Sequence, residues 1–217
     1  VGSEMCIRDR IQIEELSIKD FFMVVRLSTG ESLHIGVDRA GPFGLSKGKV
    51  IDQLEYAQLK EESDLFRCRR KALDYLAARN RSAREIETYL AGKGYSGNHI
   101  GEVVNDLVQR RYIDDYGFAL GYIRYRRGRS AVGNNLLKQE LRNKGVKREL
   151  ITQALRETAD SEADDEELYG LARKKLDKIG PKHNRFQKLS YFLYNRGFDG
   201  AAIRRVLERL RKEEGEG

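Results

Sequence analysis

Three stretches of the chain repeat one pattern: YLAGKGYSGNHIGEVVNDL at 89–107, ELRNKGVKRELITQAL at 140–155 and FLYNRGFDGAAIRRVLERL at 192–210. Each contains a basic residue followed by glycine, and successive glycines lie 51 and 52 residues apart. Apolar residues occupy the positions four before, six after and ten after each glycine: Leu90, Leu141, Leu193, Ile100, Ile151, Ile203, Val104, Leu155 and Leu207. A period near 50 residues indicates tandem structural repeats.

The basic–glycine step predicts the end of a helix. A cation suits the negative end of the helix dipole, and glycine can adopt the left-handed conformation that satisfies the last carbonyls. The next residue, which is Tyr95, Val146 or Phe198, can pack back on the helix just ended. Of the residues that then start a helix, Ser96 and Asp199 are good N-caps and Lys147 is not. We therefore interpret three glycines as structural helix stops with positive φ: Gly94, Gly145 and Gly197.

One earlier helix completes each repeat. In the first, RKALDYLAARN precedes a capping box formed by Ser82 and Glu85. The second is entered at Asp114 or Asp115 and the third near Asp164 or Asp165. The sequence thus predicts a mainly α fold of three tandem three-helix repeats in an elongated array. The expected bounds are 54–113, 114–160 and 161–212, followed by an acidic tail at 213–217.

The N-terminal part differs in composition. Residues 11–53 are expected to form a small β-hairpin and a loop region, with strands at Phe21–Leu27 and Ser32–Val37. An isolated hairpin is marginal in water, so it should pack against a helix. The helical pattern that follows suggests a break near Glu62–Asp64. Residues 1–10, VGSEMCIRDR, fit nothing downstream and are expected to be a non-native or disordered start.

Positive charge is concentrated in the middle of the chain. The formal net charge is +7, which divides into −4 for residues 1–66, +11 for 67–156 and zero for 157–217. A concentrated positive field suits an anionic partner such as nucleic acid or an acidic protein groove. A solvated helical surface would account for the charge alone equally well.

Two basic clusters are the candidate partner- or nucleic-acid-binding sites. FRCRRK supplies Arg67, Arg69 and Arg70, and YIRYRRGR supplies Tyr122, Arg124, Tyr125, Arg126, Arg127 and Arg129. Arginine can hold phosphates or carboxylates with two hydrogen bonds, and tyrosine can stack on bases or donate a hydrogen bond. The alternative is structural: Tyr122 and Ile123 face the core while the arginines face water.

The sequence offers no catalytic or metal-binding constellation. The three histidines, His34, His99 and His183, have no ligand spacing, and Asp114–Asp115 is better explained as a helix N-cap. Cys6 and Cys68 also lack a partner at metal or redox spacing. No apolar run is long enough to span a bilayer. The expectation is a non-enzymatic, cytoplasmic protein without membrane contact, metal or cofactor.

With these residues in view, the chain resembles the RecX family of regulatory proteins over about residues 66–212. The resemblance is carried by ALDYLAARNRSAREIETYLAGKGY, VVNDLVQRRYIDDYGFALGYIRYRR, LLKQELRNKGV and FLYNRGF, in that order. It implies the same fold of three tandem three-helix repeats. GLSKGKVID resembles the Gly-Leu and Lys-Gly stretch that precedes the first repeat in the family. The segment before this stretch is variable in such proteins, so residues 1–20 have no assigned role.

The resemblance also implies a function. Members of the family bind the filament that the recombinase RecA forms on DNA, lie in its helical groove and restrain its ATPase and strand exchange. The expected partner is thus the RecA filament, with single-stranded or double-stranded DNA as a further one, and the chain is expected to be a monomer. The alternative is an independent, basic, helical DNA-binding protein. The family supplies no contact motif, so the candidate residues rest on charge placement.

Overall fold

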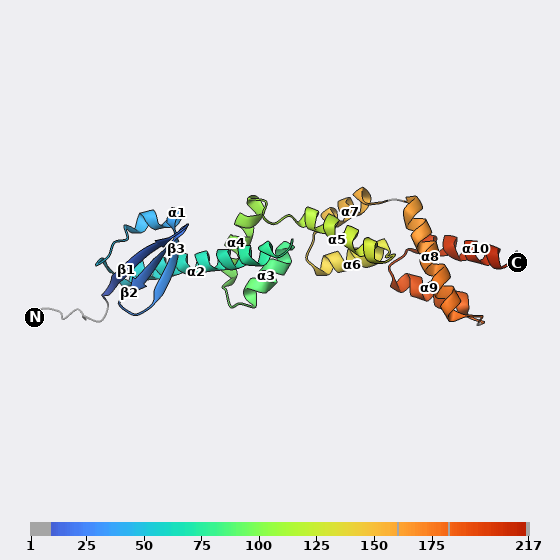
Figure 1. Cartoon of the computed structure of the whole chain (residues 1–217), viewed down its shortest axis with the longest axis horizontal. Helices are drawn as coiled ribbons and strands as arrows, with labels where there is room; N and C mark the ends of the chain where they lie inside the picture. The colour runs from blue at the N-terminus through green and yellow to red at the C-terminus, as the bar shows by residue number, and fades with distance from the viewer. Residues whose placement is uncertain (1–9, 160, 182, 216–217) are drawn as a thin grey trace, which may run out of the picture. The chain divides into compact units, whose positions relative to one another are not determined.

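A computed structural model describes residues 10–159, 161–181 and 183–215. Within them a small antiparallel sheet precedes a succession of helices (Figure 1). The chain divides into two compact units, and the first ends at Tyr112. The second unit begins at Ile113 and also includes the short segment Asn80–Glu85. The predicted non-native or disordered start falls on residues 1–9, which lie outside the described residues.

The sheet is larger than the predicted hairpin. Its strands have the order β3-β2-β1-β4 and are all antiparallel. They are β1 (Ile11–Lys19), β2 (Phe22–Leu27), β3 (Ser32–Gly36) and β4 (Val50–Ile51). The predicted hairpin corresponds to β2 and β3. This hairpin is confirmed, and it belongs to a larger sheet because β1 pairs along β2 and β4 pairs with the start of β1.

One face of this sheet forms the core of the first unit. The buried residues alternate along the strands and are joined by Leu59 of the next helix: Ile11, Ile13, Val25, Leu27, Leu33, Ile35, Ile51 and Leu59. Two short helices, α1 (Val37–Ala40) and the 3-10 helix η2 (Gly41–Phe43), connect β3 toward β4. The long helix α2 (Gln53–Ala77) then packs against β3, as the marginal stability of an isolated hairpin predicted (Figure 1).

Helix α2 is continuous, so the predicted break near Glu62–Asp64 is wrong. It begins at Asp52, whose carboxylate accepts a hydrogen bond from the Glu55 N–H at 2.8 Å. At the expected break, Ser63 is buried and its hydroxyl oxygen accepts a hydrogen bond from the backbone N–H of His34 in β3 at 2.9 Å. A polar residue in the middle of the helix therefore ties it to the sheet.

The remaining helices follow the predicted repeats. They are α3 (Ala83–Ala91), α4 (Gly97–Gln109), α5 (Asp115–Arg129), α6 (Asn134–Asn143), α7 (Arg148–Glu157), α8 (Ser161–Ile179), α9 (Arg185–Asn195) and α10 (Gly200–Gly215). Helices α5 to α7 enclose one apolar core and α8 to α10 another. The predicted mainly α fold with three three-helix repeats is confirmed.

The three glycine helix stops are confirmed. Their φ angles are +85° at Gly94, +79° at Gly145 and +83° at Gly197. The predicted apolar positions on both sides are buried at eight of nine places, and Leu207 is half-buried. Ser96 and Asp199 accept N-capping hydrogen bonds, whereas Lys147 starts α7 without a side-chain cap, as expected.

Two of these glycines have a second role that spacing did not indicate. A Cβ atom on Gly197 would lie 2.3 Å from the backbone nitrogen of Leu136, and one on Gly145 would lie 2.3 Å from Cβ of Arg84. Around Gly197, the Gly133 N–H donates to the Arg196 carbonyl at 2.9 Å and the Asn135 N–H to the Gly197 carbonyl at 3.0 Å. The α9–α10 turn is therefore docked on the N-terminus of α6.

The C-terminal repeat is longer than predicted at its C-terminal end. Helix α8 begins at Ser161, which is the expected first residue of this repeat and lies three residues before the helix entry expected near Asp164. Helix α10 continues to Gly215, so residues 213–215 are helical and do not form a solvated tail. Glu213 accepts hydrogen bonds from Arg173 and Tyr169, and Glu214 accepts one from Arg185. These acidic side chains attach the end of α10 to α8 and α9.

Ser82 is a position where one substitution tests two hydrogen bonds. Its hydroxyl accepts from the Glu85 N–H at 3.2 Å, which confirms the capping box, and donates to the Lys144 carbonyl at 2.6 Å. We expect Ser82→Ala to lower the free energy of unfolding by about 1.5–2 kcal/mol, because the cap is lost and the part-buried Lys144 carbonyl loses its donor. Urea denaturation measures this loss. Ser96→Ala, which removes only an exposed cap, should cost about 0.5–1 kcal/mol.

Candidate partner-binding surface

The second basic cluster lies on α5, and two of its members bind one carboxylate. Glu140 of α6 accepts hydrogen bonds from the Tyr122 hydroxyl at 3.0 Å and from Arg126 Nε and Nη2 at 2.9 and 2.7 Å. Burial, followed by the hydrogen bond to Glu140, raises the pKa of Tyr122. The Arg126 and Glu140 side chains are only 27% and 24% exposed. Tyr122 and Arg126 therefore hold α5 to α6.

Arg127 is also engaged inside the second unit. Its Nη1 donates to the backbone carbonyl of Thr158 after α7, and its Nη2 donates to Oδ1 of Asn134 at 3.0 Å. The guanidinium thus satisfies a carbonyl at the C-terminus of α7, where a cation also suits the helix dipole. Sequence spacing could not reveal this partner, which lies 31 residues away along the chain.

The other members of the α5 cluster face solvent. Arg124 is 67% exposed, and its Nη2 lies 3.7 Å from the Glu157 carboxylate, a distance at which an exposed pair contributes little. Tyr125 is exposed, and the guanidinium of Arg129 lies 5.5 Å from its ring centroid. Arg124, Tyr125 and Arg129 are therefore accessible to a partner, and we call them the α5 surface.

The first basic cluster is divided in the same way. On α2, Arg69 Nε lies 3.6 Å from the Asp106 carboxylate of α4, and both side chains are less than a quarter exposed. Arg67 and Arg70 are exposed, and neither forms an ion pair with any residue that the structure describes. Arg70 instead lies 5.3 Å from the ring centroid of Phe22. Arg67 and Arg70 are thus the cations of this cluster that an external anion can reach.

Aromatic residues beside Arg70 were missed by the sequence analysis, which placed them in a strand and a helix without a site role. The rings of Phe22 and Phe66 are 5.3 Å apart, and the exposed ring of Phe21 lies 5.6 Å from Phe22. These separations are typical of aromatic pairs. The sequence signal that could have revealed this aromatic site is the pair of successive phenylalanines, Phe21 and Phe22, of which Phe21 faces water.

Groups that resemble catalytic residues have structural surroundings. Nε2 of His99 lies 2.8 Å from the Glu61 carboxylate and joins α4 to α2. Burial raises the pKa of the Cys68 thiol to about 11, so this cysteine stays protonated and is a poor nucleophile at neutral pH. Among the described residues, no group of three or more His, Cys, Asp or Glu side chains is arranged to hold a metal ion.

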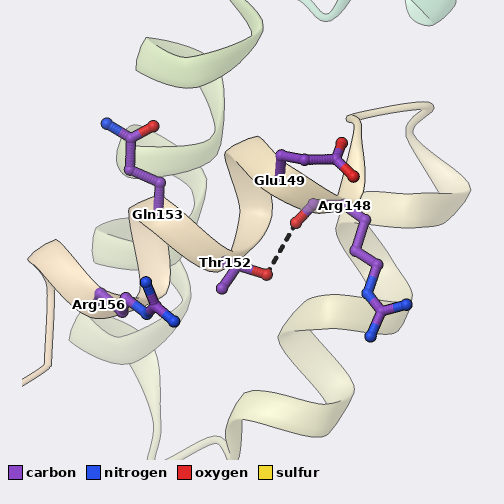
Figure 2. Close-up of a pocket in the computed structure, with 5 residues that line it drawn as sticks. All are labelled: Arg148, Glu149, Thr152, Gln153 and Arg156. Carbon is purple, nitrogen blue, oxygen red and sulfur yellow. Dashed lines mark hydrogen bonds between the residues drawn. The ribbon is translucent and has the colours of Figure 1, made fainter.

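One depression in the described surface lies along a single helix. Figure 2 shows this depression of about 350 Å³, which is lined by Arg148, Glu149, Thr152, Gln153 and Arg156, all on α7. The Thr152 hydroxyl donates to the Arg148 carbonyl within the same helix at 2.9 Å. No described helix combines the length and the hydropathy that crossing a bilayer requires. The fold and these surfaces define a helical-repeat protein whose exposed features suit binding.

Comparison with known proteins identifies the family. Models of the first, second and third three-helix domains of RecX match residues 68–107, 114–155 and 162–207. The chain therefore belongs to the RecX family of regulatory proteins. It is 32% identical to the regulatory protein RecX of Geobacillus sp. (strain WCH70), across 98% of this chain and 80% of that protein. Identity to the Bacillus cereus (strain B4264) protein of the same name is 30%, across 97% and 79%.

Solved structures agree with the fold. A crystal structure of a regulatory protein RecX superposes with a TM-score of 0.77 at 22% identity, covering 91% of this chain and 99% of that one. The structure of RecX from Lactobacillus salivarius gives a TM-score of 0.62 at 25% identity, covering 68% and 97%. The family matches begin at residue 68, so the sheet and the first part of α2 precede the shared repeats.

Proposed function

We propose that this protein binds the filament that RecA forms on DNA and restrains ATP hydrolysis and strand exchange by RecA. Membership of a family of regulatory proteins is the observation that carries the proposal. The protein acts in the cytoplasm as a monomer, without a cofactor and without catalysing a reaction. Its contribution is binding energy, which changes the activity of the partner.

Exposed cations are the proposed contacts. The α5 surface supplies Arg124, Tyr125 and Arg129, and α2 supplies Arg67 and Arg70. Charge complementarity of this kind steers association and sets the orientation of a complex. The remaining candidates, Arg69, Tyr122, Arg126 and Arg127, support the surface from within the protein.

The proposal predicts inhibition of RecA. Added in stoichiometric amounts to RecA from the same organism on single-stranded DNA, the purified protein should lower the rate of ATP hydrolysis. Co-sedimentation with the filament provides a separate measurement of binding. If neither the ATPase rate nor co-sedimentation changes, the proposed function is wrong.

A pair of double variants tests the α5 surface within this function. Arg124→Ala with Arg129→Ala should weaken inhibition several-fold, because two accessible cations are lost at a charge-complementary contact. Lys174→Ala with Lys178→Ala removes two exposed charges from α8 and is the matched control. Equal inhibition by the two double variants would exclude the α5 surface as a contact while leaving inhibition itself intact.

Independent DNA binding is the second candidate function. The exposed cations Arg67 and Arg70, in the same unit as the exposed ring of Phe21, favour it. It predicts DNA binding in the absence of RecA, with an affinity that falls as the salt concentration rises. The variants used to test it should spare Arg126 and Arg127, since these two side chains hold helices together and their loss would confound binding with folding.

A further inference from the structure

An aromatic ring is held on the surface where the sheet meets α2. Phe21 follows Asp20, which has a left-handed φ of +49° in the β1–β2 turn. The Phe21 carbonyl accepts a hydrogen bond from the Val37 N–H at 3.1 Å. The ring of Phe21 is 62% exposed and lies 6.3 Å from that of Phe66 on α2. Because backbone and ring contacts fix its position, this exposed ring is organised before any partner arrives.

Three cations lie on the segments that carry Phe21 and Phe66, and the acidic Asp20 lies next to Phe21 in the turn. Lys19 immediately precedes the turn, while Arg67 follows Phe66 and Arg70 lies one helical turn further along α2. His34 is half-buried, its ring centroid lies 5.6 Å from that of Phe22, and its buried Nδ1 has no hydrogen-bond partner among the described residues. Burial, and then the charges of Arg67, Arg70 and Lys19, lower the pKa of His34. The imidazole is therefore neutral at neutral pH and adds no charge to this surface.

We propose that this surface, the Phe21 platform (Lys19, Phe21, Phe66, Arg67 and Arg70), binds single-stranded nucleic acid. An unstacked base would lie on the exposed ring of Phe21, while Arg67 and Arg70 bind the adjacent phosphates. Aromatic rings beside cations are the combination that binds single strands without reading their sequence. A duplex keeps its bases stacked and offers only phosphates, so it binds the platform less well.

The platform shares Arg67 and Arg70 with the contacts proposed for RecA, whereas Lys19, Phe21 and Phe66 belong to the platform alone. Four of its five residues precede residue 68, where the match to the family domains begins, and all five lie in the first unit. The chain can therefore contact nucleic acid through its N-terminal sheet while its repeats contact another partner. An effect on RecA without DNA binding, or the reverse, would separate the two proposals.

Fluorescence anisotropy with a labelled oligothymidylate of about 15 nucleotides, in the absence of RecA, tests the platform on the full chain. We expect Phe21→Ala to weaken binding about tenfold, since stacking of one base on an aromatic ring is lost. Phe21→Tyr keeps a stacking ring and should bind like the wild type. Arg67→Ala and Arg70→Ala should each reduce the slope of log affinity against log salt by about 0.7.

A matched control comes from the second unit. Tyr191 on α9 is 70% exposed, comparable to Phe21, and Tyr191→Ala should leave oligonucleotide affinity unchanged. Circular dichroism of each variant verifies folding. If Phe21→Ala unfolds, the two single variants Phe21→Tyr and Arg67→Ala decide the outcome. The proposal is overturned if the wild type does not bind the oligonucleotide, if Phe21→Ala binds equally well, or if duplex DNA of the same length binds as tightly. Loss of RecA inhibition in Phe21→Ala with unchanged oligonucleotide binding would assign the platform to an acidic protein surface instead.

Discussion

Gly197→Ala is expected to lower the free energy of unfolding of the second unit by about 3–5 kcal/mol. The new Cβ would lie 2.3 Å from the backbone nitrogen of Leu136 and 2.4 Å from its Cβ, so the α9–α10 turn and α6 would have to separate. The left-handed φ of +83° adds about 1–2 kcal/mol for any residue with a Cβ, and overpacking commonly costs about 1–3 kcal/mol. Urea denaturation followed by circular dichroism measures the loss.

Gly94 provides the matched control for this prediction. It has nearly the same φ, +85°, but a Cβ there would meet no heavy atom within 4 Å. Gly94→Ala should therefore cost only about 1–2 kcal/mol, the contribution of the left-handed backbone. The difference between the two variants isolates the contact that Gly197 makes with the preceding repeat. Equal losses would show that backbone conformation alone explains the repeated glycine.

Gly145 should fall between these two. Its Cβ would lie 2.3 Å from Cβ and 2.7 Å from Cγ of Arg84, so the obstacle is a side chain rather than a backbone atom. Rotation of the Arg84 side chain can move Cγ but not Cβ, so only part of the overlap is relieved without a backbone shift. The order Gly94, Gly145, Gly197 thus follows the rigidity of the neighbour that each turn meets. A β-branched residue at Gly145 should be more harmful than alanine, since such residues tolerate positive φ least.

The helical repeats could be predicted from the sequence because their determinants are local. Leu141, Gly145 and Ile151 lie within one helix–turn–helix, and their spacing alone indicates a buried face, a helix stop and the next buried face. The sheet was predicted incompletely, because strand pairing joins distant segments. Ile11 pairs with Ile51, 40 residues away, and nothing near either residue reveals its partner.

The candidate surface also combines local sequence features with contacts between residues that are far apart in the sequence. In YIRYRRGR, the sequence showed four arginines and two tyrosines but not the acceptors that engage some of them. Glu140 lies 14 residues beyond Arg126, on a different helix, and the Thr158 carbonyl lies 31 beyond Arg127. Phe21 was assigned to a strand, since its exposure depends on the turn at Asp20. Charge composition predicts how many cations a segment has, and the fold decides which of them a partner can reach.

This division has an experimental consequence for Arg126. We expect Arg126→Ala to lower the free energy of unfolding by about 2–3 kcal/mol. Glu140 would keep its charge in a site that is 24% exposed and, among the described residues, would retain the Tyr122 hydroxyl as its only side-chain donor. Arg124→Ala removes an arginine that is 67% exposed and whose Nη2 lies 3.7 Å from the Glu157 carboxylate, so it should cost less than about 0.5 kcal/mol. Urea denaturation of both variants measures the contrast.

The combined variant Arg126→Met with Glu140→Leu shows whether the pair or its packing stabilises the second unit. Removing both charges leaves neither one unpaired, so the double variant should be more stable than Arg126→Ala, although the Tyr122 hydroxyl loses its acceptor. If Arg126→Ala is as stable as Arg124→Ala, Arg126 is not a structural residue. Its guanidinium would then be available to an anionic partner, and the α5 surface would extend toward α6.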